Sequence, residues 1–389
     1  MGGIALGWRW LTAGESHGPG LVGIVEGVPA RMALAREDID RDLERRQKGY
    51  GRGKRMAIEQ DRVEVYGGIR HGYTLGSPVA FLVRNRDFSH WTEAMSPDPA
   101  PTHRIVTRPR PGHADLVGGL KYGHRDLRNV LERASARETT MRVALGAVAR
   151  TFLAALDIRV VGHVISLGDV RAPDRIYMEE EFTRAEDSPV RVIDPASEAA
   201  MMAAIDRARA AGDTLGGQVE VCAFGLPAGL GSYVQWDRRL EADLASAMLS
   251  IQAFKGVEVG AGFRQSAEPG SAVHDEIFWT EGRGFYRESN RAGGLEGGVT
   301  TGMPLVVRAA MKPLSTLMKP LRSVDVESKD AYLAQVERSD VTAVPPAVVV
   351  AEAMMMHVLA AATLEKFGGD SLEEIRERVE RWRETTRRF

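Results

Sequence analysis

Short apolar runs bounded by glycine or proline recur along the chain at strand length. Four of them are rich in β-branched residues, which favour extended backbone. They are "LVGIVEGVPA" at 21–30, "VEVYGGI" at 63–69, "VAFLVRN" at 79–85 and "RVVGHVISLG" at 159–168. The runs "VEVCAF" at 219–224 and "LVVRAAM" from residue 305 have the same character. The pattern predicts several strands.

Segments with helical periodicity lie between these runs. Ile39 and Leu43 are four apart in residues 36–47, and residues 128–156 read as a long helix or a helix pair. Further helices are expected at 196–211, 238–253 and 345–367. A C-terminal helix is expected to begin at Ser371, which stands three residues before Glu374 at capping-box spacing.

The order of these segments gives little sign of separate domains. No low-complexity linker divides the chain; residues near 100 read as an exposed loop and residues 168–195 as a surface excursion. "LVGIVEGVP" resembles "VEVCAFGLP" weakly, which hints at a duplicated β-α unit. The three methionines from Met354 to Met356 are expected to fill the core.

Composition and charge exclude several classes of protein. The 389 residues carry a formal charge of -2, unlike the strong basic excess of a dedicated nucleic-acid binder. The one cysteine, Cys222, excludes an intrachain disulfide framework and a Cys-rich zinc site, and we expect it to be a buried thiol. We find neither a secretory signal nor an uninterrupted apolar run long enough for a membrane span. A cytoplasmic enzyme without a metal is the expectation.

The stretch "GESHG" at 14–18 satisfies the G-x-S-x-G pattern of a hydrolase nucleophile elbow. An elbow needs a helix directly after the serine, but Pro19 and Gly20 are followed by a strand-like run. We therefore expect a tight turn between strands that presents Ser16 and His17. His17 could act in acid–base chemistry or be a turn histidine bonded to nearby backbone.

Two basic stretches are candidate anion sites. In "ERRQKGYGRGKRM" at 44–56, six cations flank three glycines that would let backbone approach a ligand. The cations are Arg45, Arg46, Lys48, Arg52, Lys54 and Arg55. In "TRPRPGHAD", two prolines rigidify a turn that presents Arg108, Arg110 and His113, with His124 as an alternative base nearby. A solvated charge run is the alternative in both cases.

Three further stretches complete the candidate site. "ERASARET" places Arg133 and Arg137 four apart, which on a helix would put both on one face with Ser135 between them. The glycine-rich "SNRAGGLEGGVTTGMP" at 289–304 is expected to be a binding loop rather than regular structure. In "RSDVTAVP", Asp340 either caps the helix that follows or serves as a carboxylate in the site.

Together these motifs resemble the chorismate synthase family. "GESHG", "GYGRGKRM", "RPRPGHAD", "ERASARET", "NRAGGLEGG", "KPLST" and "RSDVTAVP" occur in the family's order, and the resemblance runs from about Trp10 to about residue 370. It implies an α/β fold, a single domain over residues 1–389 built as a β-α-β sandwich with helices packed around antiparallel sheets, and a homotetramer.

The resemblance also implies a reaction and a cofactor. The family converts 5-enolpyruvylshikimate 3-phosphate to chorismate and phosphate by a 1,4-elimination that needs reduced FMN. We find no long insertion that would suggest a flavin reductase of its own using NADPH, so an external source of reduced FMN is expected. The resemblance implies no metal, nucleic acid or membrane as a partner.

Residue roles follow from matching the motifs. The substrate, with one phosphate and two carboxylates, would be bound by Arg46, Arg52, Arg110 and Arg137. The flavin would contact Arg133, Ala134, Ser135, Gln252, Ala253, Gly297, Lys312, Pro313, Leu314, Ser315, Thr316 and Arg338. His17 would act beside the leaving phosphate, His113 near flavin N1, and Asp340 through flavin N5, while Ser16 would assist as a hydrogen-bond donor.

Two rival functions make different predictions. A serine hydrolase would depend on Ser16 as its nucleophile and would be indifferent to FMN. A noncatalytic binder of RNA or phosphoinositides would use the arginine–glycine stretch and lose affinity in salt. The absence of interleaved aromatic residues at 45–55, apart from Tyr50, weighs against the second rival.

Overall fold

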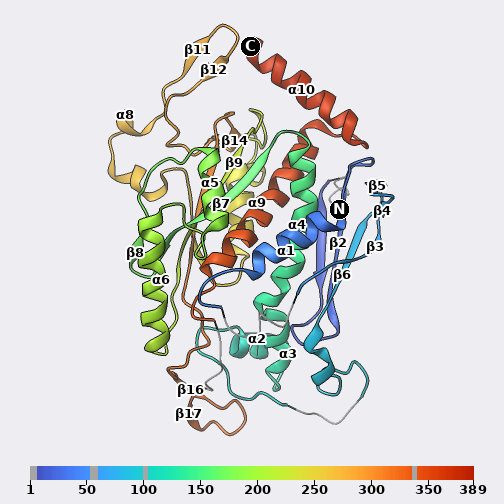
Figure 1. Ribbon diagram of the computed structural model, residues 1–389, viewed down its shortest axis with the longest axis vertical. Coiled ribbons are helices and arrows are strands. Elements are labelled where there is room, and N and C mark those ends of the chain that lie inside the picture. The colour runs from blue at the N-terminus through green and yellow to red at the C-terminus, as the bar shows by residue number, and fades with distance from the viewer. Residues whose placement is uncertain (1–6, 53–59, 100–103, 335–339) are drawn as a thin grey trace.

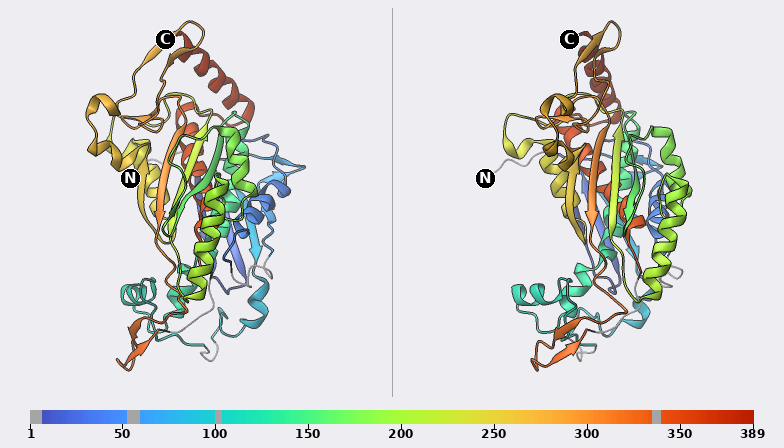
Figure 2. Two further views of the ribbon diagram at one scale, coloured as in Figure 1. Left: turned by 60° about the vertical axis from the view of Figure 1, so that its left-hand side comes forward. Right: turned by 90° about the vertical axis from the view of Figure 1, so that its left-hand side faces the viewer.

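The computed structural model describes residues 7–52, 60–99, 104–334 and 340–389. It has a layer of helices between two antiparallel sheets (Figure 1). In Figure 2 the first sheet (blue) lies on one side of these helices and the second (yellow-green to orange) on the other. The architecture is the α/β sandwich that the resemblance implied, and it agrees with the alternation of strand and helix patterns along the chain.

The first sheet has the strand order β1-β2-β6-β3. Its strands are β1 (Arg9–Ala13), β2 (Gly20–Glu26), β3 (Glu64–Gly67) and β6 (Val79–Arg84). Val79, Phe81 and Val83 alternate along β6 and are all buried, because successive side chains of a strand point to opposite faces. This buried face packs on the helix layer.

The second sheet has the order β10-β15-β9-β7-β8. Its strands are β7 (Arg159–Leu167), β8 (Val170–Arg171), β9 (Gly217–Phe224), β10 (Phe254–Val259) and β15 (Leu305–Met311). Both faces of β7 and β9 are covered, so these strands are nearly continuous buried runs rather than alternating ones. The sequence segments 159–168 and 219–224 are confirmed as strands.

The two sheets share one connectivity. If the four main strands of each are numbered in chain order, each sheet reads 1-2-4-3, and a central helix follows the second and the fourth strand. The two similar segments noted in the sequence lie on β2 and β9, which are the second strand of each sheet. The topology therefore agrees with the duplicated unit at which the sequence hinted.

Four helices fill the space between the sheets. They are α1 (Arg36–Gln47), α4 (Thr139–Ala154), α7 (Leu240–Leu249) and α9 (Val344–Phe367). A Cβ on Gly146 of α4 would lie 2.6 Å from the Cβ of Ala353 in α9, so the absent side chain permits their close crossing. By length and composition α9 could cross a membrane, but 83% of its apolar window is buried inside the protein.

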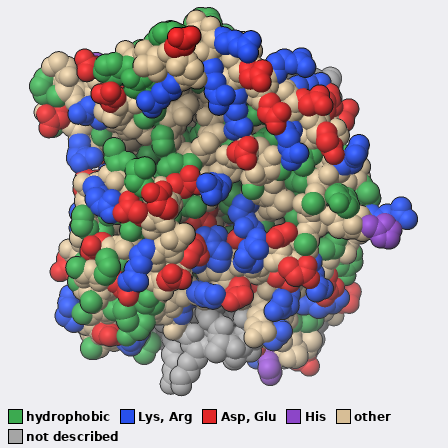
Figure 3. All heavy atoms as spheres, turned by 45° about the horizontal axis from the view of Figure 1, so that its top comes forward, with side chains coloured by type: hydrophobic (Ala, Val, Ile, Leu, Met, Phe, Trp, Pro, Cys, Tyr) green, Lys and Arg blue, Asp and Glu red, His purple; other side chains and the backbone are tan. Residues whose placement is uncertain are grey.

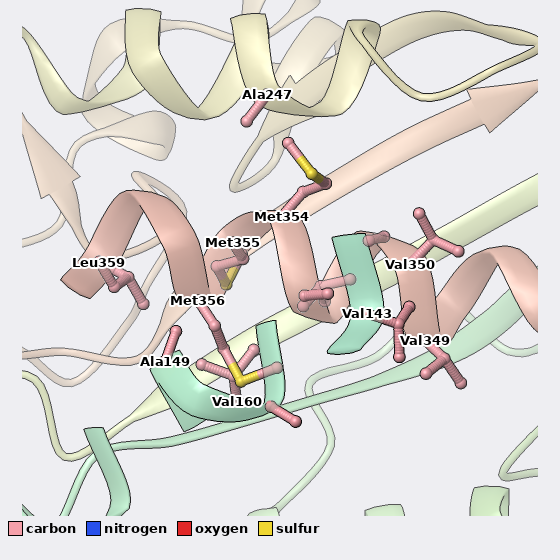
Figure 4. Packing of buried hydrophobic residues seen from close by; sticks show 14 of the residues in the cluster. Val143, Ala149, Val160, Ala247, Val349, Val350, Met354, Met355, Met356 and Leu359 are labelled. Atoms are coloured by element: carbon pink, nitrogen blue, oxygen red, sulfur yellow. The ribbon is translucent and has the colours of Figure 1, made fainter. Parts of the chain in front are cut away.

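The methionines of α9 occupy the core as expected. Figure 4 shows Met354 directed toward Ala247 of α7, while Met356 lies against Ala149 of α4 and Val160 of β7. Met354, Met355 and Met356 are at most 4% exposed. Their unbranched side chains fill the gaps between helices that approach from three directions.

Of the two alternatives for residues 128–156 the helix pair is confirmed, whereas the predicted end of the helix at 238–253 was wrong. Residues 128–156 form a pair of helices, α3 (Arg128–Ala134) and α4, separated by Ser135 in extended conformation and a 3-10 turn at Ala136–Glu138. The helix expected at 238–253 ends at Leu249, so that Gln252 and Ala253 lie in the turn before β10. The predicted capping of the last helix is confirmed, since Ser371 Oγ accepts the backbone N–H of Glu374.

The segment 168–195 is a structural cover rather than a surface excursion. It packs on the outer face of the second sheet and forms a small core there around Tyr177, Phe182 and Ile193. Cys222 of β9 is buried in the same core, as the sequence predicted, and burial raises the pKa of its thiol. Its apolar side chains are divided between this core and solvent, since Ile176 and Met178 are exposed, so the sequence pattern alone does not show that the segment covers the sheet.

The remaining elements lie outside the two sheets and the helix layer, and all but α6 and α10 are short. The strands are β4 (Ile69–Arg70), β5 (Tyr73–Thr74), β11 (Phe278–Thr280), β12 (Gly284–Tyr286), β13 (Leu295–Glu296), β14 (Val299–Thr300), β16 (Arg322–Val324) and β17 (Ala331–Leu333). The α-helices are α2 (Asp115–Tyr122), α5 (Phe182–Asp187), α6 (Pro195–Ala210), α8 (Gly270–Val273) and α10 (Leu372–Arg388). The 3-10 turns are at Arg86–His90, Glu179–Glu181, Trp236–Arg238 and Gly262–Ala267. Figures 1 and 2 show α2, α3, β16 and β17 together at one end of the molecule.

Candidate active site

The stretch "GESHG" forms the tight turn between β1 and β2. Gly14 has a φ of +107°, and a Cβ there would lie 2.4 Å from the carbonyl oxygen of Gly20, so only glycine fits. The backbone N–H of Gly18 donates to the carbonyl of Glu15 at 3.2 Å. A strand follows the turn, whereas a nucleophile elbow requires a helix there. Ser16 is therefore not the serine of a nucleophile elbow.

His17 is held by Glu132 of α3. Its Nδ1 lies 2.8 Å from Glu132 Oε2 and 3.0 Å from Oε1, and its backbone N–H donates to Oε2 at 2.9 Å. The imidazole also lies against the indole of Trp91, with ring centroids 4.1 Å apart. Burial raises the pKa of Glu132, but the hydrogen bonds and charge of His17 outweigh this effect and lower it overall.

Ser16 is buried beside the same helix. Its backbone N–H donates to the carbonyl of Glu132 at 3.1 Å, and the hydroxyl of Ser135 donates to its Oγ at 3.3 Å. Asn85 joins this turn to the arginine cluster, because its Nδ2 donates to the carbonyls of Glu15 and Gly18 while its Oδ1 accepts from Arg137 Nε at 3.1 Å.

Three predicted substrate arginines gather around Asp61. Arg137 Nη1 donates to both carboxylate oxygens of Asp61 at 2.7 and 2.8 Å, and Arg46 Nη1 lies 3.7 Å from Oδ2. Burial and the charges of Arg137 and Arg52 lower the pKa of Arg46 to about 9, against the opposing effect of Asp61. Positive charge therefore exceeds negative charge in a buried place, which favours binding of an anion.

Arg52 extends this cluster toward Asp340. Its Nε lies 3.4 Å from Asp340 Oδ2, and burial lowers the pKa of Arg52 although both Asp340 and Asp61 raise it. The Nε atom is buried and makes no hydrogen bond to a described residue. Asp340 does not cap α9, because the N-cap is Ala343. Arg338, together with Lys54 and Arg55, lies outside the described residues.

The glycines beside these arginines contact protein. A Cβ on Gly51 would lie 3.0 Å from Ile205 and 3.4 Å from Thr342, and the carbonyl of Gly51 accepts the backbone N–H of Val341 at 3.0 Å. Gly49 packs in the same way against Pro345. For these two glycines the close approach is therefore to protein, at α6 and at the start of α9.

His113 and Arg110 share a second buried carboxylate. His113 Nδ1 lies 2.6 Å from Asp115 Oδ1, and Arg110 Nε donates to Asp115 Oδ2 at 2.9 Å. Arg110 Nη1 also donates to the hydroxyl of Thr316 at 3.3 Å. Burial raises the pKa of Asp115, but its bonds to His113 and Arg110 lower it overall. His124 is exposed beside Tyr122, apart from this group.

Most predicted flavin residues lie on two segments that meet. Lys312 Nζ donates to the carbonyl of Gly112 at 2.6 Å, and a Cβ on Gly112 would lie 3.6 Å from Ser315. The backbone N–H of Lys312 donates to the carbonyl of Ala253 at 2.9 Å. The segment of Lys312, Pro313, Leu314, Ser315 and Thr316 thus connects the His113 loop to the turn that follows α7.

The break at Ser135 changes the expected arrangement of its neighbours. Arg133 and Arg137 do not share a helical face, because the extended Ser135 separates them and its Oγ accepts the backbone N–H of Arg137. Arg133 turns to the carbonyls of Thr12 and Gly14, whereas Arg137 turns to Asp61. Ala134 is the last residue of α3.

Glu138 joins Arg133 to the turn after α7. Its carboxylate accepts from Thr12 Oγ1 at 2.8 Å and from Gln252 Nε2 at 3.2 Å, and Arg133 Nη2 lies 4.0 Å from it. The other amide atom, Gln252 Oε1, is buried and has no hydrogen-bond partner among the described residues. A buried acceptor without a partner suits a ligand N–H group.

Gly297 is the one described flavin candidate that lies elsewhere. It is in the turn between β13 and β14, near Tyr233, with a φ of +61°. That turn precedes β15 whereas Lys312 follows it, and a seven-residue strand spans roughly 20 Å. The glycine-rich segment is also not an irregular loop throughout, since it contains the β13–β14 hairpin.

The sequence did not reveal several residues of this site. Asp115 and Glu132 stand inside recognised motifs, where an acidic residue next to a candidate histidine or arginine was an available signal. Asp61, Asn85 and Trp91 carry no local signal, because the chain brings them to their partners only on folding. Among the described residues, no group of three His, Cys, Asp or Glu side chains could hold a metal ion.

Comparison with known proteins gives a consistent result. A family model described as chorismate synthase matches residues 8–364. A chorismate synthase of Geobacillus kaustophilus (strain HTA426) is 58% identical over 387 residues, covering 98% of this chain and 100% of the relative. Chorismate synthase 1 of Bacillus cereus (strain ATCC 14579) is 57% identical over 389 residues with the same coverage. A solved structure described as the crystal structure of chorismate synthase has a TM-score of 0.81 and 43% identity, covering 98% of this chain and 99% of that one.

Proposed function

Because the chain belongs to the chorismate synthase family, we propose that it converts 5-enolpyruvylshikimate 3-phosphate to chorismate and phosphate, with reduced FMN as cofactor. The observation that carries the proposal is the buried cluster of Arg46, Arg52 and Arg137, which among the described residues faces two carboxylates, Asp61 and, beside Arg52, Asp340. Its excess positive charge is what a substrate with a phosphate and two carboxylates requires. Arg110 adds a fourth guanidinium beside His113.

The two histidines have separate proposed tasks. His17 supplies a proton or positive charge to the departing phosphate as the C–O bond breaks. His113 stabilises the reduced cofactor. Asp340 is the carboxylate that would accept the ring proton when the flavin is bound, and Ser16 would assist as a hydrogen-bond donor. The connection of His17 to the arginine cluster through Asn85 supports these assignments, because it fixes both groups in one framework.

The described residues fit a reduced flavin. Gln252 Oε1 provides a buried acceptor for a ring N–H, and Arg133 and Lys312 provide cations on either side of the turn at Ala253. Ala134, Ser135 and residues 313–316 would contact the ring system, and Arg338 would complete the set. When bound, the reduced flavin supplies electron density to the allylic system from which phosphate leaves.

The oligomeric state, the source of reduced FMN and the location in the cell remain predictions from the sequence. We propose a homotetramer that obtains reduced FMN from an external flavin reductase and acts in the cytoplasm, where a free thiol such as Cys222 suits the reducing conditions. Turnover with NADPH and oxidised FMN alone would contradict the external source. We assign no metal, nucleic acid or membrane partner.

The rival functions find no support. A serine nucleophile needs a hydrogen bond from its Oγ to a base such as histidine. Among the described contacts Ser16 Oγ has no such bond, and His17 Nδ1 is bound to Glu132. Figure 3 shows basic and acidic side chains intermixed over the face that it displays, without the single-sign surface of a polyanion binder.

An anaerobic assay tests the proposal. Phosphate release and chorismate absorbance are followed from 5-enolpyruvylshikimate 3-phosphate with chemically reduced FMN. His17→Ala and His113→Ala should each lower kcat about 100-fold or more, the usual contribution of a positioned acid or base, while the circular dichroism spectrum stays unchanged. His124→Ala should keep the wild-type rate. Absence of phosphate release by the wild type would refute the function, and full rates in both histidine variants would refute their roles.

A further inference from the structure

We propose that Glu132 and Asp115 are positioning residues that hold His17 and His113 by Nδ1 and so assign Nε2 of each ring to the reaction. The inference rests on the function proposed above for the two histidines. It adds a shared design, in which each histidine is paired with its own buried carboxylate.

The two pairs share a short contact between Nδ1 and a carboxylate and the same pattern of exposure, although Arg110 Nη2 also lies 3.2 Å from Nδ1 and 3.4 Å from Nε2 of His113. Nδ1 lies 2.8 Å from the carboxylate in the His17–Glu132 pair and 2.6 Å in the His113–Asp115 pair. The histidine side chains are 16% and 19% exposed, whereas both carboxylates are 1% exposed. Each ring is thus held from the protein side and retains an accessible part.

The chemistry of the carboxylate fixes the proton on Nδ1. Hydrogen bonds lower the pKa of both Glu132 and Asp115, so both are ionised at neutral pH. An ionised carboxylate can only accept, and Nδ1 must therefore carry hydrogen whether the ring is neutral or charged. The nitrogen that gains and loses a proton is then Nε2.

Glu132 fixes the orientation of His17 as well as its tautomer. The same carboxylate accepts the backbone N–H of His17 at 2.9 Å and Arg128 Nη1 at 3.0 Å, while the Glu132 carbonyl accepts the backbone N–H of Ser16. Trp91 covers the imidazole at a centroid distance of 4.1 Å. Rotation of the ring would break the bond to Glu132 and the contact with Trp91 together.

Asp115 has the same relation to His113. Its Oδ2 accepts both the backbone N–H of Arg110 at 3.1 Å and the side-chain Nε at 2.9 Å, while Oδ1 contacts His113 Nδ1 and also accepts from Arg110 Nη2 at 3.2 Å. Because Asp115 is the first residue of α2, the helix fixes the carboxylate, and the carboxylate fixes the loop that carries His113. In both pairs an arginine balances the charge of the carboxylate.

The chain also offers a matched control. Glu220 and His163 form a third buried carboxylate–histidine pair at 3.2 Å, on the outer side of the second sheet and apart from the proposed site. Glu220→Gln removes the same kind of charge from the same kind of partner. It should change the ring signals of His163 and leave kcat unchanged.

The test combines histidine NMR with kinetics. In protein labelled with ¹⁵N-histidine, the His17 and His113 rings should show a proton on Nδ1 in the wild type at neutral pH. Glu132→Gln and Asp115→Asn, whose amides can also donate, should admit the Nε2–H tautomer of the adjacent ring. Each should lower kcat about 100-fold, within the usual range for acid–base catalysis, while KM for the substrate changes less than threefold.

Several outcomes would overturn the inference. One is an Nε2–H tautomer of either ring in the wild type, which needs no variant to fold. Another is an unchanged tautomer and kcat in both variants, and a third is a raised KM and lowered thermal stability with the tautomer unchanged, as a merely structural role predicts. A wild-type protein with the expected tautomers but no phosphate release would refute the proposed function and leave the positioning of the rings intact.

Discussion

Asp61 is the residue on which the arginine cluster depends. Its buried carboxylate binds Arg137 through two short contacts and lies close to Arg46, so one negative charge offsets the two guanidinium groups of Arg46 and Arg137. Removing one partner of a buried ion pair is costly, because the charge that remains has lost both water and its counter-ion. The local stability of the fold is therefore coupled to the occupancy of the anion site.

Asp61→Asn should lower the free energy of unfolding by about 3–5 kcal/mol, and inorganic phosphate should stabilise this variant more than it stabilises the wild type. The phosphate would supply the negative charge that the substitution removes. Urea unfolding with phosphate or chloride at equal ionic strength measures the effect. Asp174→Asn, which removes a carboxylate paired with Arg264 and Arg308 outside the site, should show no such phosphate dependence. Equal phosphate effects on all three proteins would contradict the prediction.

His357 gives the fold a dependence on pH. It is buried in α9, where its Nδ1 accepts a hydrogen bond from Trp8 Nε1 and its Nε2 lies 3.2 Å from the carbonyl of Arg142. Burial lowers the pKa of His357 to about 4. Below the ordinary pKa of histidine the unfolded chain binds a proton that the folded chain does not. The free energy of unfolding therefore decreases as the pH is lowered.

The contribution of His357 to the free energy of unfolding should therefore decrease by about 3 kcal/mol between pH 6.5 and pH 4, with no further loss below that range. His357→Gln retains an acceptor and a donor but cannot titrate, and it should flatten this part of the pH profile. Chemical denaturation at several pH values measures both proteins. Parallel profiles for the variant and the wild type would show that another group is responsible.

At the scale of elements, the crossing of α4 and α9 determines how closely the two halves of the core approach. Gly146 and Ala353 meet at this crossing, where even a methyl group would overlap its neighbour. A glycine inside a helix ordinarily costs about 1 kcal/mol relative to alanine, so its presence in α4 is explained by packing and not by helix propensity.

Gly146→Ala should destabilise the protein by about 1–3 kcal/mol, because overpacking outweighs the gain in helix propensity. The second-site change Ala353→Gly should recover part of the loss by removing the methyl group on the opposite helix. Thermal unfolding of the two single variants and the double variant gives the coupling between the sites. A stabilised Gly146→Ala protein, or strictly additive effects, would mean that the helices adjust without strain.

At the scale of the whole molecule, the helix layer unites the two sheets and brings the substrate candidates together. Arg46 lies in the last turn of α1, Arg137 directly before α4 and Asp340 shortly before α9. The outer face of the first sheet, in contrast, exposes Leu11, Val22 and Ile24. Such an apolar face suits burial against another copy of the chain.

Light scattering of the purified protein should give the mass of four chains. Leu11→Lys, at a β1 residue that is 71% exposed, should shift the protein to smaller species because it places a charge in the expected interface. Ile176→Lys is the matched control, since Ile176 is 73% exposed on the segment that covers the second sheet. A monomeric wild type, or an unchanged mass in Leu11→Lys, would refute this role for the first sheet.

The sequence by itself determined the element types and the motifs of the site. Strand and helix patterns depend on the alternation of apolar side chains along a short segment, so β2, β7, α6 and α9 could be predicted from their own residues. Ser16, His17 and His113 became candidates because glycine-rich and proline-rich surroundings predict turns that present polar side chains.

Only the tertiary structure decided which of these residues meet. The extended Ser135 separates Arg133 from Arg137, Asp61 joins Arg46 to Arg137, and Gly297 lies at the other end of β15 from Lys312. The tertiary structure likewise places the carboxylates of Glu132 and Asp115 against His17 and His113. Burial and charge pairing depend on distances between segments remote in the chain, and those distances are fixed when the two sheets close on the helix layer.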